Sequence, residues 1–236
     1  MVRESAKRKT PAKRTERARR VPDSQRAPGR GKYDRATSPD EREKAQLRRL
    51  LDAAGHVFAE MGWADATVEA IVNRAGMSRR TFYEHFADLK ECLLVLHQKM
   101  TKIAFRAIDS QIQAQATPPD MLKMGAEAFL GGIAAFPHMA RVMFRVVRSA
   151  GTEFEKIHEQ MMVRFAKLVL DGVERSFESS QGTIRRPADG QVELRVFALV
   201  SGMEAIGMRY VMRGEEAKAT EAVPVLVDMV RKIFAP

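Results

Sequence analysis

The residues best suited to chemistry lie together at 73–91, which reads NRAGMSRRTFYEHFADLKE. This stretch combines arginines, hydroxyl groups, a histidine and glutamates, a composition that suits either acid/base catalysis or the binding of an anion. Glu84 and His85 are neighbours in the sequence. On a helix their side chains would diverge by about 100° and could not share one proton-transfer site. An anionic partner therefore fits the stretch better than catalysis does.

Capping residues and a glycine divide this region into two short helices. Thr67 is expected to cap the first helix, over about 68–75, and Gly76 to end it. Ser78 is expected to cap the second helix, over about 79–86. Two short helices joined by a tight glycine turn indicate a helix-turn-helix, whose second helix enters the major groove of DNA.

The second helix has an inward and an outward face. Phe82 and Phe86 lie four residues apart and face inward for packing. The residues left near the exposed face are Arg79, Arg80, Thr81, Tyr83 and Glu84. Arginine matches the O6 and N7 acceptors of guanine, and the hydroxyl groups can donate to phosphates or base edges. The amides at the helix N-termini, at Thr67 and Ser78, add positive ends for phosphates.

The charge of the chain is concentrated at its start. Residues 1–39 carry 13 Lys and Arg against 4 Asp and Glu, whereas the other 27 basic and 26 acidic residues nearly cancel. The same segment is poor in aliphatic residues and is expected to be disordered. A basic tail on a near-neutral body predicts a polyanionic partner. A single cysteine, Cys92, and the lack of an apolar run of about 20 residues predict a cytoplasmic protein that does not interact with a membrane.

Apolar residues recur at three- and four-residue steps through the rest of the chain, which is typical of amphipathic helices. Helices are expected over about 40–62, for about 25 residues from Leu89, and over about 120–136, 138–149, 152–179, 190–213 and 220–235. A polar segment at 179–190 is expected to be a loop. Strand patterns and hairpin turns are absent. The predicted fold class is all-α.

The segment TVEAIVNRAGMSRRTFYEHFADLKECLL, at 67–94, together with the helix before it, resembles the tetracycline-repressor (TetR) family of bacterial transcription regulators. The resemblance covers about residues 45–95. It implies a three-helix helix-turn-helix DNA-binding head on a larger helical ligand-binding and dimerisation body. The expected divisions are a disordered basic tail at 1–39, the DNA-binding domain at 40–88 and the body at 89–236. A homodimer would bind operator DNA as a repressor and release it when a small effector binds.

The resemblance also assigns roles to individual residues. Thr67, Tyr83 and His85 are expected at phosphates, and Arg79, Arg80 and Thr81 at base edges. The family usually has a phosphate-binding lysine at the start of its fourth helix. This chain has Leu89 there, so either Lys90 replaces that contact or the contact is lost.

Methionine and aromatic residues recur in the body, where they suit an adaptable cavity for an apolar or amphipathic effector as well as an ordinary core. The candidate ligand-binding residues are Phe129, Met143, Phe144, Met161 and Phe165. The fourth helix is expected to act as the lever between effector and head.

The last two helices are expected to form the dimer interface, because each carries one apolar face that could also close the core of the monomer. The candidate interface residues are Val196, Val200, Met203, Gly207, Tyr210, Val223, Leu226, Val230 and Ile233.

Two other functions remain open at this point. A nonspecific DNA-compacting protein would use the same tail and helix-turn-helix without a cavity. A helical-bundle metalloenzyme would use the Glu155–His158 pair, but the E-x-x-H spacing occurs once here and di-iron bundles need it twice. Phosphate-binding, zinc-protease and nucleophile motifs are absent, so neither an enzyme, a cofactor nor a bound metal is expected.

Overall fold

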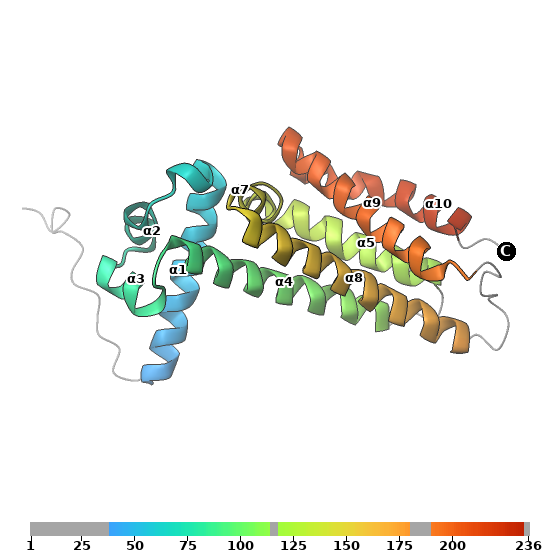
Figure 1. Cartoon of the computed structure of the whole chain (residues 1–236), viewed down its shortest axis with the longest axis horizontal. Helices are drawn as coiled ribbons and strands as arrows, with labels where there is room; N and C mark the ends of the chain where they lie inside the picture. Colours follow the sequence, from blue (N-terminus) through green and yellow to red (C-terminus); the bar gives the residue numbers. More distant parts are fainter. Residues whose placement is uncertain (1–37, 114–117, 180–189, 234–236) are drawn as a thin grey trace, which may run out of the picture.

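The computed structural model describes residues 38–113, 118–179 and 190–233, and all regular structure in these ranges is helical (Figure 1). The predicted all-α fold, with a small N-terminal head on a larger body, is confirmed. Residues 1–37 of the predicted basic tail and nearly all of the predicted 179–190 loop lie outside the described residues. In the described ranges, no helix is both long and apolar enough to span a membrane.

The head consists of α1 (Pro39–Asp65), α2 (Val68–Ala75) and α3 (Arg79–His85). Ser38 begins α1 with a capping box, and Gly62, with φ at 77°, interrupts its helical geometry where the sequence predicted a stop. Thr67 and Ser78 accept hydrogen bonds from the first-turn amides of α2 and α3, as predicted. Gly76 ends α2 in the left-handed conformation, at φ 62°. Local signals therefore fix the boundaries of all three helices.

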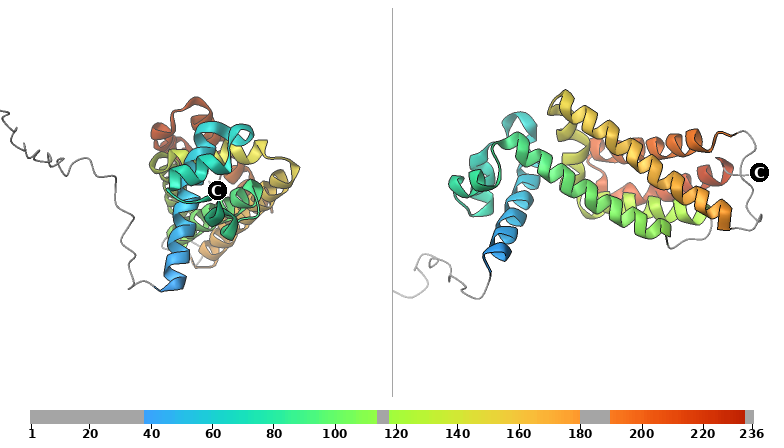
Figure 2. Two further views of the ribbon diagram at one scale, coloured as in Figure 1. Left: turned by 90° about the vertical axis from the view of Figure 1, so that its left-hand side faces the viewer. Right: turned by 60° about the horizontal axis from the view of Figure 1, so that its bottom comes forward.

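The body consists of α4 (Leu89–Gln113), α5 (Pro118–Ala135), α8 (Thr152–Ser179), α9 (Val192–Arg213) and α10 (Val223–Ile233), with shorter elements between them. The long helices run roughly along one axis, with the head at one end of the body (Figures 1 and 2). Asp88 caps the start of α4, where the Glu91 amide donates to the Asp88 carboxylate at 2.8 Å, but the Glu91 carboxylate accepts from the amide of Ala87 and not from that of Asp88, so the predicted capping box is only half formed. This helix runs from the head along the body.

The predicted helix at 138–149 is three consecutive elements: α6 (Pro137–Arg141), a π-helical turn η2 (Val142–Val146) and α7 (Val147–Ser149). In η2 the amide of Val147 bonds to the carbonyl of Val142, five residues earlier. A π turn is wider than an α turn and changes which side chains share a face. The expected helix at 220–235 likewise begins as a 3-10 helix, η3 (Glu216–Ala222), before α10.

Most of the apolar side chains predicted for a dimer face on α9 and α10 are used to close the core of the same chain. Val196, Val200, Met203, Val223 and Leu226 are buried against the rest of the body, and Tyr210 packs half-buried at its edge. A β-carbon added at Gly207 would lie 2.7 Å from Ile133 of α5, so this glycine allows close approach within the monomer. The side chains of Val230 and Ile233 lie outside the described residues. An apolar stripe indicates that a face is buried but not which partner buries it.

Candidate DNA-binding surface and ligand cavity

The N-terminus of α3 is held in a fixed geometry. The hydroxyl of Ser78 accepts from the amide of Thr81 at 3.1 Å, and the two hydroxyl oxygens lie 3.0 Å apart. On the opposite side, Phe82 and Phe86 are almost fully buried in the core of the head. This packing leaves the polar face of α3 directed outward, as the sequence predicted.

The outward face of α3 presents two arginines, each with a partner on the same helix. The Arg80 Nε donates to the Glu84 carboxylate at 3.0 Å, and both side chains are largely exposed. A hydrogen bond with Tyr83 raises the pKa of the Arg79 guanidinium. Tyr83 is itself 50% exposed. Both guanidinium groups are therefore accessible, but each has a local contact that a base edge would have to replace.

Three other predicted DNA contacts surround this face. Thr67 is exposed and accepts from the amide of Ala70 at 3.1 Å, and His85 is half-buried near the end of α3. Lys90 forms an ion pair with Glu153 of α8, and this hydrogen bond raises the pKa of the lysine. Lys90 thus links the start of α4 to the body in this arrangement.

The body encloses a cavity of about 530 Å³ between α4, α5, α6 with η2, α8 and α9. All five predicted ligand-binding residues line it: Phe129, Met143, Phe144, Met161 and Phe165. The ring of Phe165 stacks on Phe105 with centroids 3.9 Å apart, and Phe129 meets Phe144 edge-on at 6.3 Å. The volume lies within the range of cavities for small molecules, and the walls are mainly apolar.

One part of the cavity wall is polar and charged. His158 Nε2 lies 2.8 Å from the Glu204 carboxylate, and an Arg148 nitrogen lies 2.8 Å from the same oxygen. Burial by itself would raise the pKa of Glu204, but the hydrogen bonds from His158 and Arg148 hold it below the ordinary value. Thr101 lines the cavity nearby and donates to the Met161 sulfur at 3.5 Å. A mainly apolar cavity thus has one region with charged groups.

The segment α6–η2 contacts both the head and the cavity. Val142, Val146 and the following Val147 are buried in the same apolar cluster as the core residues of the head. Met143 and Phe144, between them, line the cavity. The π turn therefore places neighbouring residues in the head core and in the wall of the cavity.

Comparison with known proteins shows first what the head resembles and then what a longer part of the chain resembles. Residues 50–95 match the family described as bacterial regulatory proteins, tetR family. The chain is 27% identical over 158 residues to the HTH-type transcriptional regulator EthR of Mycolicibacterium smegmatis, covering 66% of this chain and 70% of EthR. Residues 50–95 thus match the DNA-binding region of the tetR family, and the chain is similar to regulators of that family. It is a DNA-binding transcription regulator and not an enzyme, as the sequence predicted.

Solved structures share the fold of this chain over the body as well as the head. The fatty acid degradation regulator FadR of Bacillus halodurans matches with a TM-score of 0.67 and 20% identity, over 78% of this chain and 96% of that protein. FadR of Bacillus subtilis, solved in complex with stearoyl-CoA, matches with a TM-score of 0.68 and 17% identity, over the same shares.

The sequence did not indicate some residues that the TetR fold brings together. Arg148 and Glu204 are 56 residues apart, and no spacing rule connects them. Asp52 and His56 on α1 meet His138 of α6 at the junction of head and body. The i, i+4 spacing of Asp52 and His56 was a readable signal, whereas the approach of His138 depends on tertiary packing.

His97 is a buried titratable group in α4. Its side chain is 2% exposed, and neither ring nitrogen has a hydrogen-bond partner among the described residues. Burial, with a smaller contribution from His158, lowers the pKa of His97 from 6.5 to about 4. The folded protein therefore keeps this imidazole neutral while an unfolded chain would take up a proton between those two values.

This difference predicts that stability falls as the pH drops through 6.5 toward 4, because the unfolded state then binds the extra proton. At pH 5 His97 alone should lower the free energy of unfolding by about 2 kcal/mol relative to pH 7. Urea denaturation of the unsubstituted protein and of His97→Leu at both pH values measures this effect. Between pH 7 and pH 5, the free energy of unfolding of His97→Leu should fall by about 2 kcal/mol less than that of the unsubstituted protein. An equal loss in both proteins would show that His97 does not titrate as its burial implies.

Proposed function

We propose that this TetR-family protein is a homodimeric repressor that leaves a near-palindromic operator when an amphipathic effector with a long apolar part enters the cavity. The main support is that α6–η2 contributes to both the head core and the cavity wall. A molecule in the cavity can therefore alter the packing of the head. FadR of Bacillus subtilis, a structural relative, was solved with stearoyl-CoA. The cavity here combines mainly apolar walls with a region of charged groups, which matches the chemistry of such a molecule. A repressor of this kind would work in the cytoplasm.

On this proposal, α3 reads the operator from the major groove. Arg79 and Arg80, with Thr81, would contact base edges, because they lie on the outward face at its N-terminal end. The phosphate contacts would come from Thr67, Ser78, Tyr83, His85 and Lys90. Lys90 can reach a phosphate only by leaving Glu153. The lysine would then exchange one negative partner for another.

The arginine assignment predicts a change in sequence preference. Arg79→Ala and Arg80→Ala should each lose about 1–3 kcal/mol of discrimination at one operator position, because bidentate contact with guanine is lost. Tyr83→Phe should weaken binding to all sequences equally. Selection from random duplex DNA followed by affinity measurement at fixed salt tests these expectations.

Arg106→Ala, an exposed substitution on α4, is the matched control and should change neither preference nor affinity. If both head variants kept the preferred sequence of the unsubstituted protein, the arginines would be phosphate contacts and the assignment would be wrong. If the unsubstituted protein recovered all sequences uniformly, it would be a DNA-compacting protein instead.

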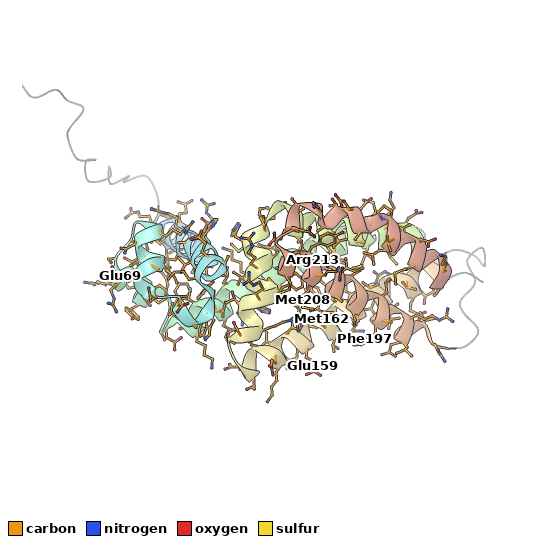
Figure 3. All side chains as sticks on the ribbon, turned by 90° about the horizontal axis from the view of Figure 1, so that it is seen from above. Glu69, Glu159, Met162, Phe197, Met208 and Arg213 are labelled. Atoms are coloured by element: carbon orange, nitrogen blue, oxygen red, sulfur yellow. The ribbon has the colours of Figure 1, made fainter. Side chains whose placement is uncertain are left out.

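The proposed dimer uses the face of α9 that points away from the core. Leu194, Phe197 and Met212 are 63%, 45% and 63% exposed and follow helical spacing along one side. Val225 and Met229 of α10 are also exposed. Figure 3 looks onto this part of the molecule and labels Phe197 and Met208 on α9. Exposed apolar residues of this number, concentrated on two helices, favour association with a second copy.

Substitution of Phe197 tests this face. Phe197→Glu should produce a monomer at micromolar concentration, because the carboxylate would be buried without a partner in the interface. Val163→Glu, at an exposed apolar position on α8, should leave the mass unchanged. Sedimentation velocity distinguishes the two species. A dimeric Phe197→Glu variant, or a monomeric unsubstituted protein, would contradict the proposed interface.

The effector proposal is tested with stearoyl-CoA as the probe. Saturating stearoyl-CoA should weaken binding to the selected duplex by about 5- to 150-fold. Gly131→Phe should reduce the affinity for stearoyl-CoA at least about tenfold, because Gly131 lines the cavity and has open space at its β-carbon position. Val163→Leu, outside the cavity, serves as the control. If Gly131→Phe bound and responded to stearoyl-CoA normally, the probe would act elsewhere.

A further inference from the structure

A cluster of three potential metal ligands lies at the junction of head and body, outside the DNA-binding face and the cavity wall. Asp52 and His56 belong to α1 of the head, and His138 belongs to α6 of the body. One ligand atom from each lies within 4.8 Å of the other two. Asp52 is exposed and both histidines are half-buried. Neither the proposed DNA contacts nor the proposed effector contacts use these three side chains.

The local geometry favours convergence of the three side chains. Asp52 and His56 are one helical turn apart, so they share a face of α1. The His56 and His138 rings are stacked, with centroids 4.0 Å apart and planes inclined by 7°. Rotation about the χ2 bond of one ring, which is a broad and soft torsion, turns its nitrogen toward the carboxylate and the other ring. A separation of 4.8 Å or less between ligand atoms can then close onto one ion with bonds of about 2.1 Å.

The surroundings do not oppose a cation as strongly as the nearby arginines suggest. Arg74 is paired with Glu60 at 2.7 Å, and Arg141 is paired with Glu216 at 2.8 Å.

We propose that Asp52, His56 and His138 bind one divalent transition-metal ion that bridges the head and the body. Two imidazoles and one carboxylate suit Zn²⁺, Ni²⁺ or Co²⁺ and discriminate against Mg²⁺ and Ca²⁺, which prefer oxygen ligands throughout. Three protein ligands leave coordination positions for water.

An ion at this position fixes α1 against α6 in the present arrangement. The two helices are already in close contact between the ligands, because a β-carbon at Gly55 would lie 2.6 Å from the end of the Met139 side chain. Met139 also lines the cavity. Metal binding and cavity occupancy therefore act on the same short helix. The metal site itself does not depend on the identity of the effector or of the operator.

The experiment uses the full chain without an affinity tag, dialysed free of metal. Titration with Co²⁺, followed by visible absorption, should give one ion per chain without a thiolate charge-transfer band, because the single cysteine, Cys92, is fully buried. Zn²⁺ should compete with Co²⁺, and Mg²⁺ in large excess should not. Zn²⁺ should also raise the melting temperature, because it binds the folded state.

Three histidine variants locate the ion. His56→Gln and His138→Gln should each weaken Co²⁺ binding at least about tenfold and abolish the Zn²⁺-induced rise in melting temperature. His158→Gln should keep both, because His158 is engaged with Glu204 in the cavity wall. Far-ultraviolet circular dichroism confirms folding of each variant, and Asp52→Asn, on the exposed side of α1, provides a second test with little risk to folding.

Two outcomes overturn the proposal. One is the absence of Co²⁺ or Zn²⁺ binding to the unsubstituted protein at micromolar concentrations. The other is binding that persists unchanged in His56→Gln, His138→Gln and Asp52→Asn, which would place the ion elsewhere. Neither outcome affects the proposal on operator recognition, which is tested separately by the duplex sequence that the protein selects.

Discussion

The structure depends on one shared apolar cluster in which the body completes the core of the head. Val142, Val146, Val147 and Phe154 are buried together with the core residues of α1, α2 and α3. Full burial of each such side chain is worth about 1.5–3 kcal/mol. The head therefore cannot swing freely on α4. Any change in its orientation requires this cluster to repack, and packed interfaces of this kind change between discrete arrangements.

The π turn η2 converts this packing constraint into a route for coupling. It alternates residues of the head cluster with Met143 and Phe144 of the cavity wall within five positions. The fourth helix, expected from sequence to act as the lever, also spans both regions, with Leu93 in the head cluster and Ile108 in the body core. Head and cavity are thus joined by two elements, α4 and the segment α6–η2.

Short sequence patterns predicted the features of this protein that depend on a few adjacent residues. Thr67, Gly76 and Ser78 fixed the helix-turn-helix, since capping and left-handed glycine conformations are properties of a few adjacent residues. The aromatic and methionine residues assigned to a ligand site line the cavity, because large, flexible side chains fill the interior of a bundle incompletely.

Long-range features were beyond this kind of prediction. The sequence assigned the buried face of α9 and α10 to a second subunit. An apolar stripe shows that a face is covered, but it does not show whether α5 of the same chain or a helix of a partner covers it. Nothing in 138–149 signalled a π turn. The ion pair of Lys90 with Glu153 depends on the packing of α4 near α8, since the two residues lie far apart in the sequence.

The central claim, that the shared cluster transmits cavity occupancy to the head, can be measured directly by thermodynamic linkage. The fold-change in duplex affinity caused by saturating stearoyl-CoA is compared between the unsubstituted protein and Val146→Ala, together with the affinity of each for stearoyl-CoA alone. Because Val146 lies in the cluster and not in the cavity wall, the variant should bind the probe about equally well while the fold-change shrinks by about 2- to 30-fold. An undiminished fold-change in Val146→Ala would contradict this account.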